Sequence, residues 1–248
     1  MSYKIYKNTI SNKISKKIFN LVLKNCNFYC PSLFDKNDVF KKTWSDPEFI
    51  KKMINFRKKN KKRFSAMYES LKISSDFQRM LFDSNLDLVA KKFLKVKRDE
   101  LLVRGMTLRM DFPHDARNSY GWHQDNAYDK YNLNSKNGVV LWIPLIDTNE
   151  RNGTLIIKPG SEFSTFQCSS KVNKGTKYKS LQLLVKEKFL KIYKSKSIDC
   201  KKNSALATYS GIFHKSGINL SDHIRFTIVV RFNNQFSKDF LFYRNLNI

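Results

Sequence analysis

Hydrophobic residues in the first hundred positions recur at the spacing of helices. Ile14, Ile18, Leu21 and Val22 fall on one helical face, and Ser11 before them is a favoured N-cap residue. This pattern predicts a short amphipathic helix near the N-terminus.

Two further helices are predicted from their start signals. Ser45 and Glu48 form an S-x-x-E capping pair with Pro47 in the first turn, and this helix can continue into the basic run at residues 57–63. We interpret that run as a solvated face or a helix end. A third helix opens at Ser75, with Gln78 three residues later. Its apolar positions are Phe77, Met80, Leu81, Leu88 and Val89.

From about residue 100 the pattern changes to short β-forming segments separated by turn residues, which is typical of sandwiches and barrels. Asn152-Gly153 and Pro159-Gly160 are turn signals. The expected strands are 101–111, 138–146, 153–157, 195–199, 204–208 and 224–232. We expect a single domain, mainly β, with N-terminal helices packed against the outside of the sheet. Its parts are a helical segment at 1–99, a β core at 100–233 and a tail at 234–248.

Composition adds a large positive charge to this picture. Of the 248 residues, 41% are hydrophobic and 14% aromatic, which is ample for a buried core and argues against a disordered chain. Lys and Arg number 47 against 21 Asp and Glu, giving +26. An AT-rich coding bias, which favours lysine and asparagine everywhere, explains this charge without any partner. An anionic small substrate is the second explanation, and binding to nucleic acid or an anionic membrane is the third.

The cysteines give no sign of a disulfide-rich protein. Cys26, Cys30, Cys168 and Cys200 are few and scattered, so we interpret them as reduced thiols. No second Cys/His pair lies close enough to Cys26 and Cys30 to suggest a zinc site. The N-terminus does not resemble a signal peptide, and no run of 18 apolar residues could span a membrane. A cytoplasmic location is therefore expected.

His123, Asp125 and His214 are the residue types that bind a mononuclear iron. An Fe(II) that activates O2 takes two imidazoles and one carboxylate on one face and keeps its other positions open. Residues i and i+2 of a strand share a face, so His123 and Asp125 could project together while Gln124 points away. The alternative is that these histidines are ordinary hydrogen-bonded residues, because an H-x-D pair by itself often occurs by chance.

Three other residues favour the metal site. Arg225 lies in a strongly β-forming run, where a buried guanidinium would need an anion to offset its desolvation. Ser216, two residues after His214, could add a hydroxyl to the same anion. Trp142 lies in an apolar predicted strand and could form a wall of the pocket.

Several motifs, in order and spacing, resemble the phytanoyl-CoA dioxygenase family between residues 100 and 233. They are Trp122-His123-Gln124-Asp125, Leu141-Trp142-Ile143-Pro144-Leu145, Asn152-Gly153-Thr154-Leu155, Pro159-Gly160-Ser161, His214-Lys215-Ser216 and Arg225. The family comprises Fe(II)- and 2-oxoglutarate-dependent oxygenases. The resemblance implies a double-stranded β-helix, a jelly-roll or cupin-like core flanked by α-helices. One departure is Glu162, where the family commonly has histidine.

The resemblance also implies roles for individual residues. His123, Asp125 and His214 would bind iron, and Arg225 with Ser216 would hold the distal carboxylate of 2-oxoglutarate. Trp142 and Thr107 match positions that line the co-substrate. The expected reaction uses O2, releases succinate and CO2, and hydroxylates a C–H bond. Hydroxylation is favoured over halogenation because the carboxylate ligand that related halogenases lack is present.

The substrate is expected to be a small metabolite, and an anionic one would suit the charge. Arg109, Lys158 and Arg231 are candidate substrate residues, although each could equally be an exterior charge on a strand. Two other functions stay open. One is an oxygenase that dealkylates nucleic acid, for which no specific pattern of aromatic and basic residues is found. The other is a cupin-like barrel that binds metal or ligand without catalysis, with Arg225 as a structural ion pair. The sequence does not predict an oligomeric state.

Overall fold

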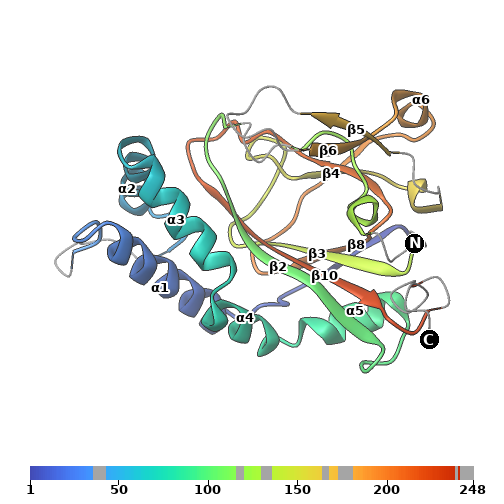
Figure 1. The fold of residues 1–248 in the computed structure, drawn as a ribbon, viewed down its shortest axis with the longest axis horizontal. Helices are drawn as coiled ribbons and strands as arrows, with labels where there is room; N and C mark the ends of the chain where they lie inside the picture. The colour runs from blue at the N-terminus through green and yellow to red at the C-terminus, as the bar shows by residue number, and fades with distance from the viewer. Residues whose placement is uncertain are drawn as a thin grey trace, which may run out of the picture.

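The computed structural model describes residues 1–35, 43–115, 120–129, 136–163, 168–172, 181–237 and 240. The described residues form an N-terminal strand, six α-helices and a set of antiparallel sheets (Figure 1). The N-terminal elements are β1 (Tyr3–Tyr6), α1 (Asn12–Tyr29), α2 (Pro47–Lys59), α3 (Lys61–Lys72), α4 (Ser75–Phe82) and α5 (Leu86–Leu94).

The helices begin close to the predicted positions, with small corrections. Ser11 caps α1 and accepts from the backbone N–H of Ile14, as predicted. The predicted Ser45 cap is wrong, because Asp46 caps α2 and accepts from two backbone N–H groups of the first turn. Ser74, one residue before the predicted start, caps α4. The predicted third helix is not continuous, because α4 ends at Phe82, and Leu88 and Val89 lie on α5.

The basic run at residues 57–63 does not lie on one helix. Asn60 leaves helical geometry with φ −128° and ψ 56°, so α2 ends at Lys59 and α3 begins at Lys61. Its side chains are mainly exposed, as expected for a solvated face. Arg57 is the exception: its guanidinium lies 4.2 Å from the ring centre of Phe112 and forms an ion pair with Asp115.

The sheets contain every strand that the sequence predicted. They are formed by β2 (Leu101–Asp111), β3 (Gly138–Pro144), β4 (Leu155–Lys158), β5 (Cys168–Val172), β6 (Leu181–Val185), β7 (Lys196–Ile198), β8 (Ala205–Tyr209), β9 (Phe213–Ser216) and β10 (Arg225–Asn234), with a short helix α6 (Glu187–Leu190) before β7. A five-stranded sheet has the order β1-β8-β3-β10-β2, a three-stranded sheet the order β7-β4-β9, and β5 pairs with β6. All pairings are antiparallel.

The predicted fold class is therefore confirmed in its coarse form, antiparallel sheets with N-terminal helices. The term mainly β is not confirmed, because helices make up much of the described chain. The strands form separate sheets, and no closed barrel is seen among the described residues. None of the helices in the described ranges is long and apolar enough to cross a membrane.

The two faces of β10 have different environments, and one of them faces the candidate active site described below. Phe226, Ile228, Val230 and Phe232 belong to the hydrophobic cluster that also contains residues of α1 to α5. The ring centre of Phe226 lies 4.7 Å from that of Trp44, which precedes α2. Because side chains alternate along a strand, residues 225, 227, 229, 231 and 233 face the other way, where Val229 shares a second hydrophobic cluster with Leu155 and Ile157 of β4.

Candidate active site

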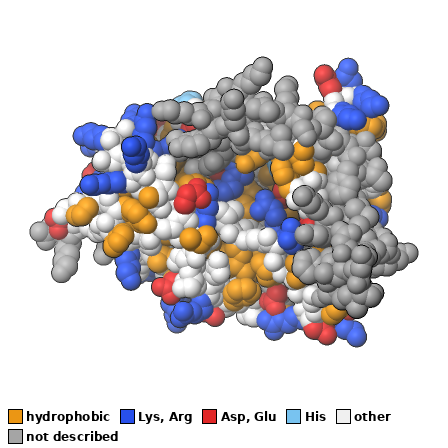
Figure 2. All heavy atoms as spheres, in the orientation of Figure 1, with side chains coloured by type: hydrophobic (Ala, Val, Ile, Leu, Met, Phe, Trp, Pro, Cys, Tyr) orange, Lys and Arg blue, Asp and Glu red, His pale blue; other side chains and the backbone are white. Residues whose placement is uncertain are grey.

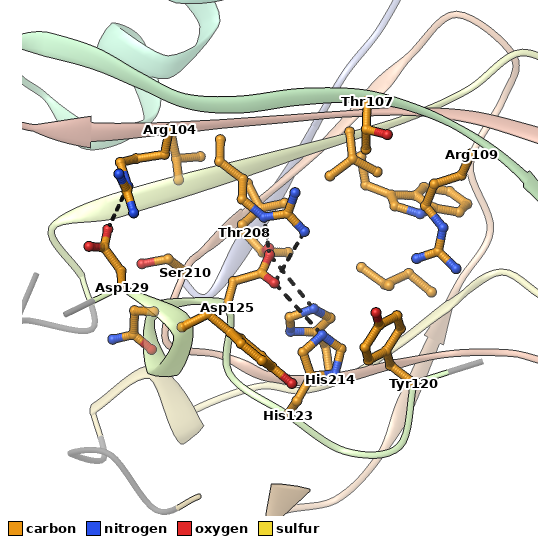
Figure 3. Close-up of a pocket in the computed structure, with 18 of the residues that line it drawn as sticks. Arg104, Thr107, Arg109, Tyr120, His123, Asp125, Asp129, Thr208, Ser210 and His214 are labelled. Carbon is orange, nitrogen blue, oxygen red and sulfur yellow. Dashed lines mark hydrogen bonds and ion pairs between the residues drawn. The ribbon is translucent and has the colours of Figure 1, made fainter. Parts of the chain in front are cut away.

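His123 and Asp125, which are close in sequence, meet the distant His214 between the five-stranded and the three-stranded sheet. Each of His123, Asp125 and His214 has a potential ligand atom that lies within 4.8 Å of those of the other two. The Nε2 atom of His123 is 3.7 Å from Asp125 Oδ1, and that of His214 is 4.0 Å from Asp125 Oδ2 (Figure 3). The two histidines are 7% exposed.

A two-residue antiparallel bridge holds the two histidines side by side. The backbone N–H of each donates to the carbonyl of the other at 3.0 Å, and their ring centres are 4.1 Å apart. The expectation that His123 and Asp125 project from one strand is wrong, because Asp125 begins a 3-10 helix, Asp125–Tyr128. Gln124 does point away: it is fully buried and its side-chain amide donates to the carbonyl of Gly211.

Backbone carbonyls orient both imidazoles. His123 Nδ1 lies 2.8 Å from the carbonyl of Gly121, and His214 Nδ1 lies 3.0 Å from the carbonyl of Ile212. Because a carbonyl oxygen can only accept, each Nδ1 carries the proton and each Nε2 presents its lone pair toward Asp125. Burial, reinforced by the neighbouring His214, lowers the pKa of His123 to about 3, so this imidazole is neutral at physiological pH.

The Asp125 carboxylate is ionised and paired with Arg231. Burial alone would raise the pKa of Asp125, but Arg231 and the two imidazoles outweigh burial and lower it. Arg231 Nε donates to Asp125 Oδ2 at 3.0 Å and its Nη2 donates to Oδ1 at 3.3 Å, so a planar fork meets both oxygens. Two imidazoles and an ionised carboxylate form a donor set that fits a divalent iron.

A cavity of about 410 Å³ surrounds this cluster. Of the residues singled out from the sequence, Thr107, Arg109, Trp142, Ser216 and Arg231 line it. Lys158 is not among the lining residues. Its Nζ donates to the carbonyl of Tyr193, and it lies 5.0 Å from the ring centre of Trp122. The structure therefore does not place Lys158 at the candidate site.

The structure adds lining residues that the sequence did not single out. They include Tyr68, Arg104, Tyr120, Asn126, Asp129, Thr208, Ser210 and Asn233. Strand alternation along β10 could have found Asn233, which shares a face with Arg231. The same alternation does not predict that Arg104, on β2, lines the cavity, because the pairing between β10 and β2 shifts at this residue. Arg231 pairs with Gly105, and Phe232 pairs with Val103.

Arg225 lies at the end of the five-stranded sheet, 1% exposed. Its Nη2 forms a 3.0 Å ion pair with Asp111 Oδ2, and its Nη1 donates to the carbonyls of Asn152 and Gly217, each at 3.3 Å. The sequence analysis expected an anion beside this buried guanidinium, and in the structure Asp111 on the neighbouring strand is such an anion. The Nε atom of Arg225 is buried and has no hydrogen-bond partner among the residues that the structure describes.

Figure 2 shows that this face of the molecule is hollowed near its centre, with basic side chains in and beside the hollow. Acidic side chains also appear on the face, so the charge of +26 does not form one continuous basic surface there. Glu162, at the position where the family commonly has histidine, is 1% exposed and accepts from the backbone N–H of Gly160.

Solved structures share this fold at low sequence identity. AviO1 from Streptomyces viridochromogenes Tue57 aligns with a TM-score of 0.59 and 14% identity over 95% of this chain and 91% of AviO1. EctD from S. alaskensis in its apoform aligns with a TM-score of 0.56 and 17% identity over 96% and 76%. EvdO2 from Micromonospora carbonacea var. aurantiaca, in a complex with 2-oxoglutarate, aligns with a TM-score of 0.55 and 16% identity over 94% and 86%.

Other alignments cover less. With another EvdO2 structure the match spans 64% of each chain, and with EvdMO1 it spans 32% of that longer protein. No curated protein sequence matches this chain.

The sequence model of phytanoyl-CoA dioxygenases (PhyH) matches residues 35–227, most of the chain. This match, together with the cluster of His123, Asp125 and His214, confirms the prediction of Fe(II) and 2-oxoglutarate as cofactor and co-substrate. The chain belongs to the phytanoyl-CoA dioxygenase family, whose members are Fe(II)- and 2-oxoglutarate-dependent oxygenases.

Proposed function

We propose that the protein hydroxylates a C–H bond of a small metabolite, consuming 2-oxoglutarate and O2 and releasing succinate and CO2. The observation that carries this proposal is the convergence of His123, Asp125 and His214 inside a cavity, with ligand atoms within 4.8 Å of one another. The presence of Asp125 supports hydroxylation rather than halogenation, because a carboxylate takes the ligand position that a halide would need.

Different residues of the chain would bind the iron and the co-substrate. His123, Asp125 and His214 would hold Fe(II), which when bound supplies the activation of O2. Their carbonyl partners orient the imidazoles, and Arg231 keeps the carboxylate ionised before any metal arrives. Ser216 and Arg225 would hold the distal carboxylate of 2-oxoglutarate.

The walls of the cavity would orient the reactants and exclude water. Trp142, 3% exposed, and Thr107 line the cavity on the five-stranded sheet, where they would flank the co-substrate.

The five-stranded and three-stranded sheets would be the two halves of a double-stranded β-helix. Residues 1–248 would act as one domain, since helices 1–99 and core strands share a hydrophobic cluster.

An anionic substrate is supported by the guanidinium groups that line the cavity. Arg109 and Arg231 both reach it, although each is already paired with an aspartate. The charge on the outer surface gives no further support, since coding bias explains it as well.

A barrel that binds metal without turnover is the second candidate. The ion pair between Arg225 and Asp111 favours it, because a structural role for Arg225 predicts such a partner. The two functions differ in whether 2-oxoglutarate is consumed.

The first test measures binding of Fe(II) under anaerobic conditions, and then succinate formation with O2 and a library of metabolites. His123→Ala and Asp125→Ala should each abolish iron binding and turnover, because each removes a ligand from a three-ligand site. Arg225→Ala should mainly raise the 2-oxoglutarate concentration needed for turnover.

His223→Ala is the matched control, since His223 is exposed and does not line this cavity. Normal iron binding in His123→Ala would remove the metal assignment. Iron binding without succinate formation with any metabolite would favour the non-catalytic barrel.

A further inference from the structure

We infer that Arg109 and Arg225 together form a clamp of two guanidinium groups, bridged by Asp111, for the distal carboxylate of 2-oxoglutarate. This inference rests on the proposed function, in which Arg225 binds that carboxylate. It reassigns Arg109 from the substrate to the co-substrate and makes it a residue that selects keto-diacids over keto-monoacids.

One carboxylate joins the two arginines. Arg109 Nη2 donates to Asp111 Oδ1 at 3.0 Å, and Arg225 Nη2 forms its ion pair with Asp111 Oδ2 at the same distance. The two contacts use opposite oxygens of one side chain, so the guanidinium groups lie on either side of it. Burial alone would raise the pKa of Asp111, but Arg109 and Arg225 outweigh burial and lower it, so the bridge is ionised.

Strand register explains why these residues meet. On adjacent strands Arg225 pairs with Asp111 and Thr227 pairs with Arg109, so all four lie within two residues of one another along the sheet. Arg109, whose side chain is 19% exposed, lines the cavity, whereas Arg225 is buried and is not among the lining residues. Figure 3 shows Arg109 pointing into the cavity from β2, on the far side of the histidines from Arg104.

The electrostatics of the group favour an additional anion. Asp111 is 6% exposed and is shared between two guanidinium groups. A shared carboxylate compensates each buried cation less than a dedicated one would. A ligand carboxylate placed beside Asp111 would complete the compensation, and a guanidinium fork matches its two oxygens.

Two buried hydrogen-bond donors at this place also have no partner within the described part of the chain. They are Arg225 Nε and Thr227 Oγ1, on side chains that are 1% and 0% exposed. Both are donors, and buried donors are almost always hydrogen-bonded in folded proteins. Since Thr227 is the cross-strand partner of Arg109, a carboxylate held by Arg109 would lie close to both unsatisfied donors.

The expected consequence is selectivity by charge at the far end of the co-substrate. 2-Oxoglutarate and 2-oxobutyrate share the keto-acid group that would bind the metal, but only the first has a distal carboxylate. Arg109 should therefore matter for the diacid and have little effect on the monoacid.

The experiment is calorimetric titration of 2-oxoglutarate and of 2-oxobutyrate into the full chain loaded with Mn(II) under anaerobic conditions. Wild type should prefer the diacid. Arg109→Gln should weaken binding of 2-oxoglutarate by about 10- to 100-fold, the loss expected for a charge-assisted hydrogen bond, and change 2-oxobutyrate binding by less than about twofold. Arg109→Lys should restore part of the loss.

Arg98→Gln is the control, because Arg98 is also paired with an aspartate, Asp87, but does not line the cavity. Its 2-oxoglutarate affinity should match wild type. An Arg109→Gln protein that unfolds cooperatively and binds 2-oxoglutarate as tightly as wild type overturns the clamp. So does an equal loss for both keto acids, which would indicate general damage. If Mn(II)-loaded wild type binds neither keto acid, the proposed function fails as well. This outcome differs from failure of the clamp alone, in which wild type still binds 2-oxoglutarate.

Discussion

At the scale of single residues, the fork between Arg231 and Asp125 organises the metal cluster. A carboxylate held at both oxygens by a planar guanidinium cannot rotate freely, so its remaining lone pairs keep a fixed direction. Arg231 is therefore better described as a residue that positions Asp125 than as a bare charge in the cavity, whatever contact it also makes with substrate.

Arg231→Gln should weaken metal binding by about 10- to 100-fold, the range typical for loss of a partner that orients a ligand. Arg231→Lys should recover little, because an ammonium cannot contact both oxygens in the same plane. Calorimetric titration of Mn(II) into the metal-free variants measures this, with exposed Arg63→Gln as control. Wild-type metal affinity in Arg231→Gln would show that the fork is dispensable.

Residue types and spacing pointed to His123, Asp125, His214 and Arg225, and the structure brings the first three together. Their partners could not be predicted from the sequence. Asp111 meets Arg225 only through the register of two strands 114 residues apart in sequence, 225 − 111. Local pattern carries no information about such a pairing.

At the scale of elements, the turn at Gly153 sets the position of Arg225. Gly153 has φ +82°, where other residues are strained, and a Cβ there would lie 2.5 Å from both Arg225 Nη1 and the carbonyl oxygen of Gly217. The turn and the end of β9 therefore pack against the guanidinium with no space for a side chain.

Gly153→Ala should lower the free energy of unfolding by about 1–3 kcal/mol through backbone strain and displace Arg225, thereby weakening 2-oxoglutarate binding. Denaturant unfolding and keto-acid titration measure the two effects. Gly105→Ala is the matched control, because a Cβ there would have no atom within 4 Å. If both alanine variants behave alike, the turn does not position Arg225.

Elements with a strong local pattern were predicted well. The expected strand 101–111 coincides with β2, and that at 224–232 nearly coincides with β10. The strands that were missed, β1, β5, β6 and β9, are only four or five residues long. The separate helix α3 was also missed, because nothing in the basic run signalled a break at Asn60. Short elements depend on pairing and packing with distant residues more than on their own sequence.

At the scale of the whole molecule, the helices complete the core of the five-stranded sheet. Trp44 contacts Phe226 on β10 and Phe19 on α1, with ring centres 4.7 and 4.9 Å away, and its indole N–H donates to Ser15. One side chain thus links the helical part to the central strands.

Trp44→Ala should lower the free energy of unfolding by about 3–5 kcal/mol, the cost of truncating a buried aromatic residue. If the chain is one cooperative unit, thermal unfolding should remain a single transition shifted to lower temperature. Phe28→Ala is the control, since Phe28 is 77% exposed. Two separate transitions, with only one of them shifted, would contradict the single-domain proposal.

The order of strands in space differs from their order of synthesis. Among the described strands β10 is the last in sequence, yet it lies in the sheet between β3 and β2, which are made long before it. A nascent chain that ends before β10 has all three candidate iron ligands but lacks the strand that carries Arg231 and Arg225. Because Arg231 positions Asp125, we expect a chain truncated between His214 and β10 to bind metal weakly and to expose the unpaired edges of β2 and β3.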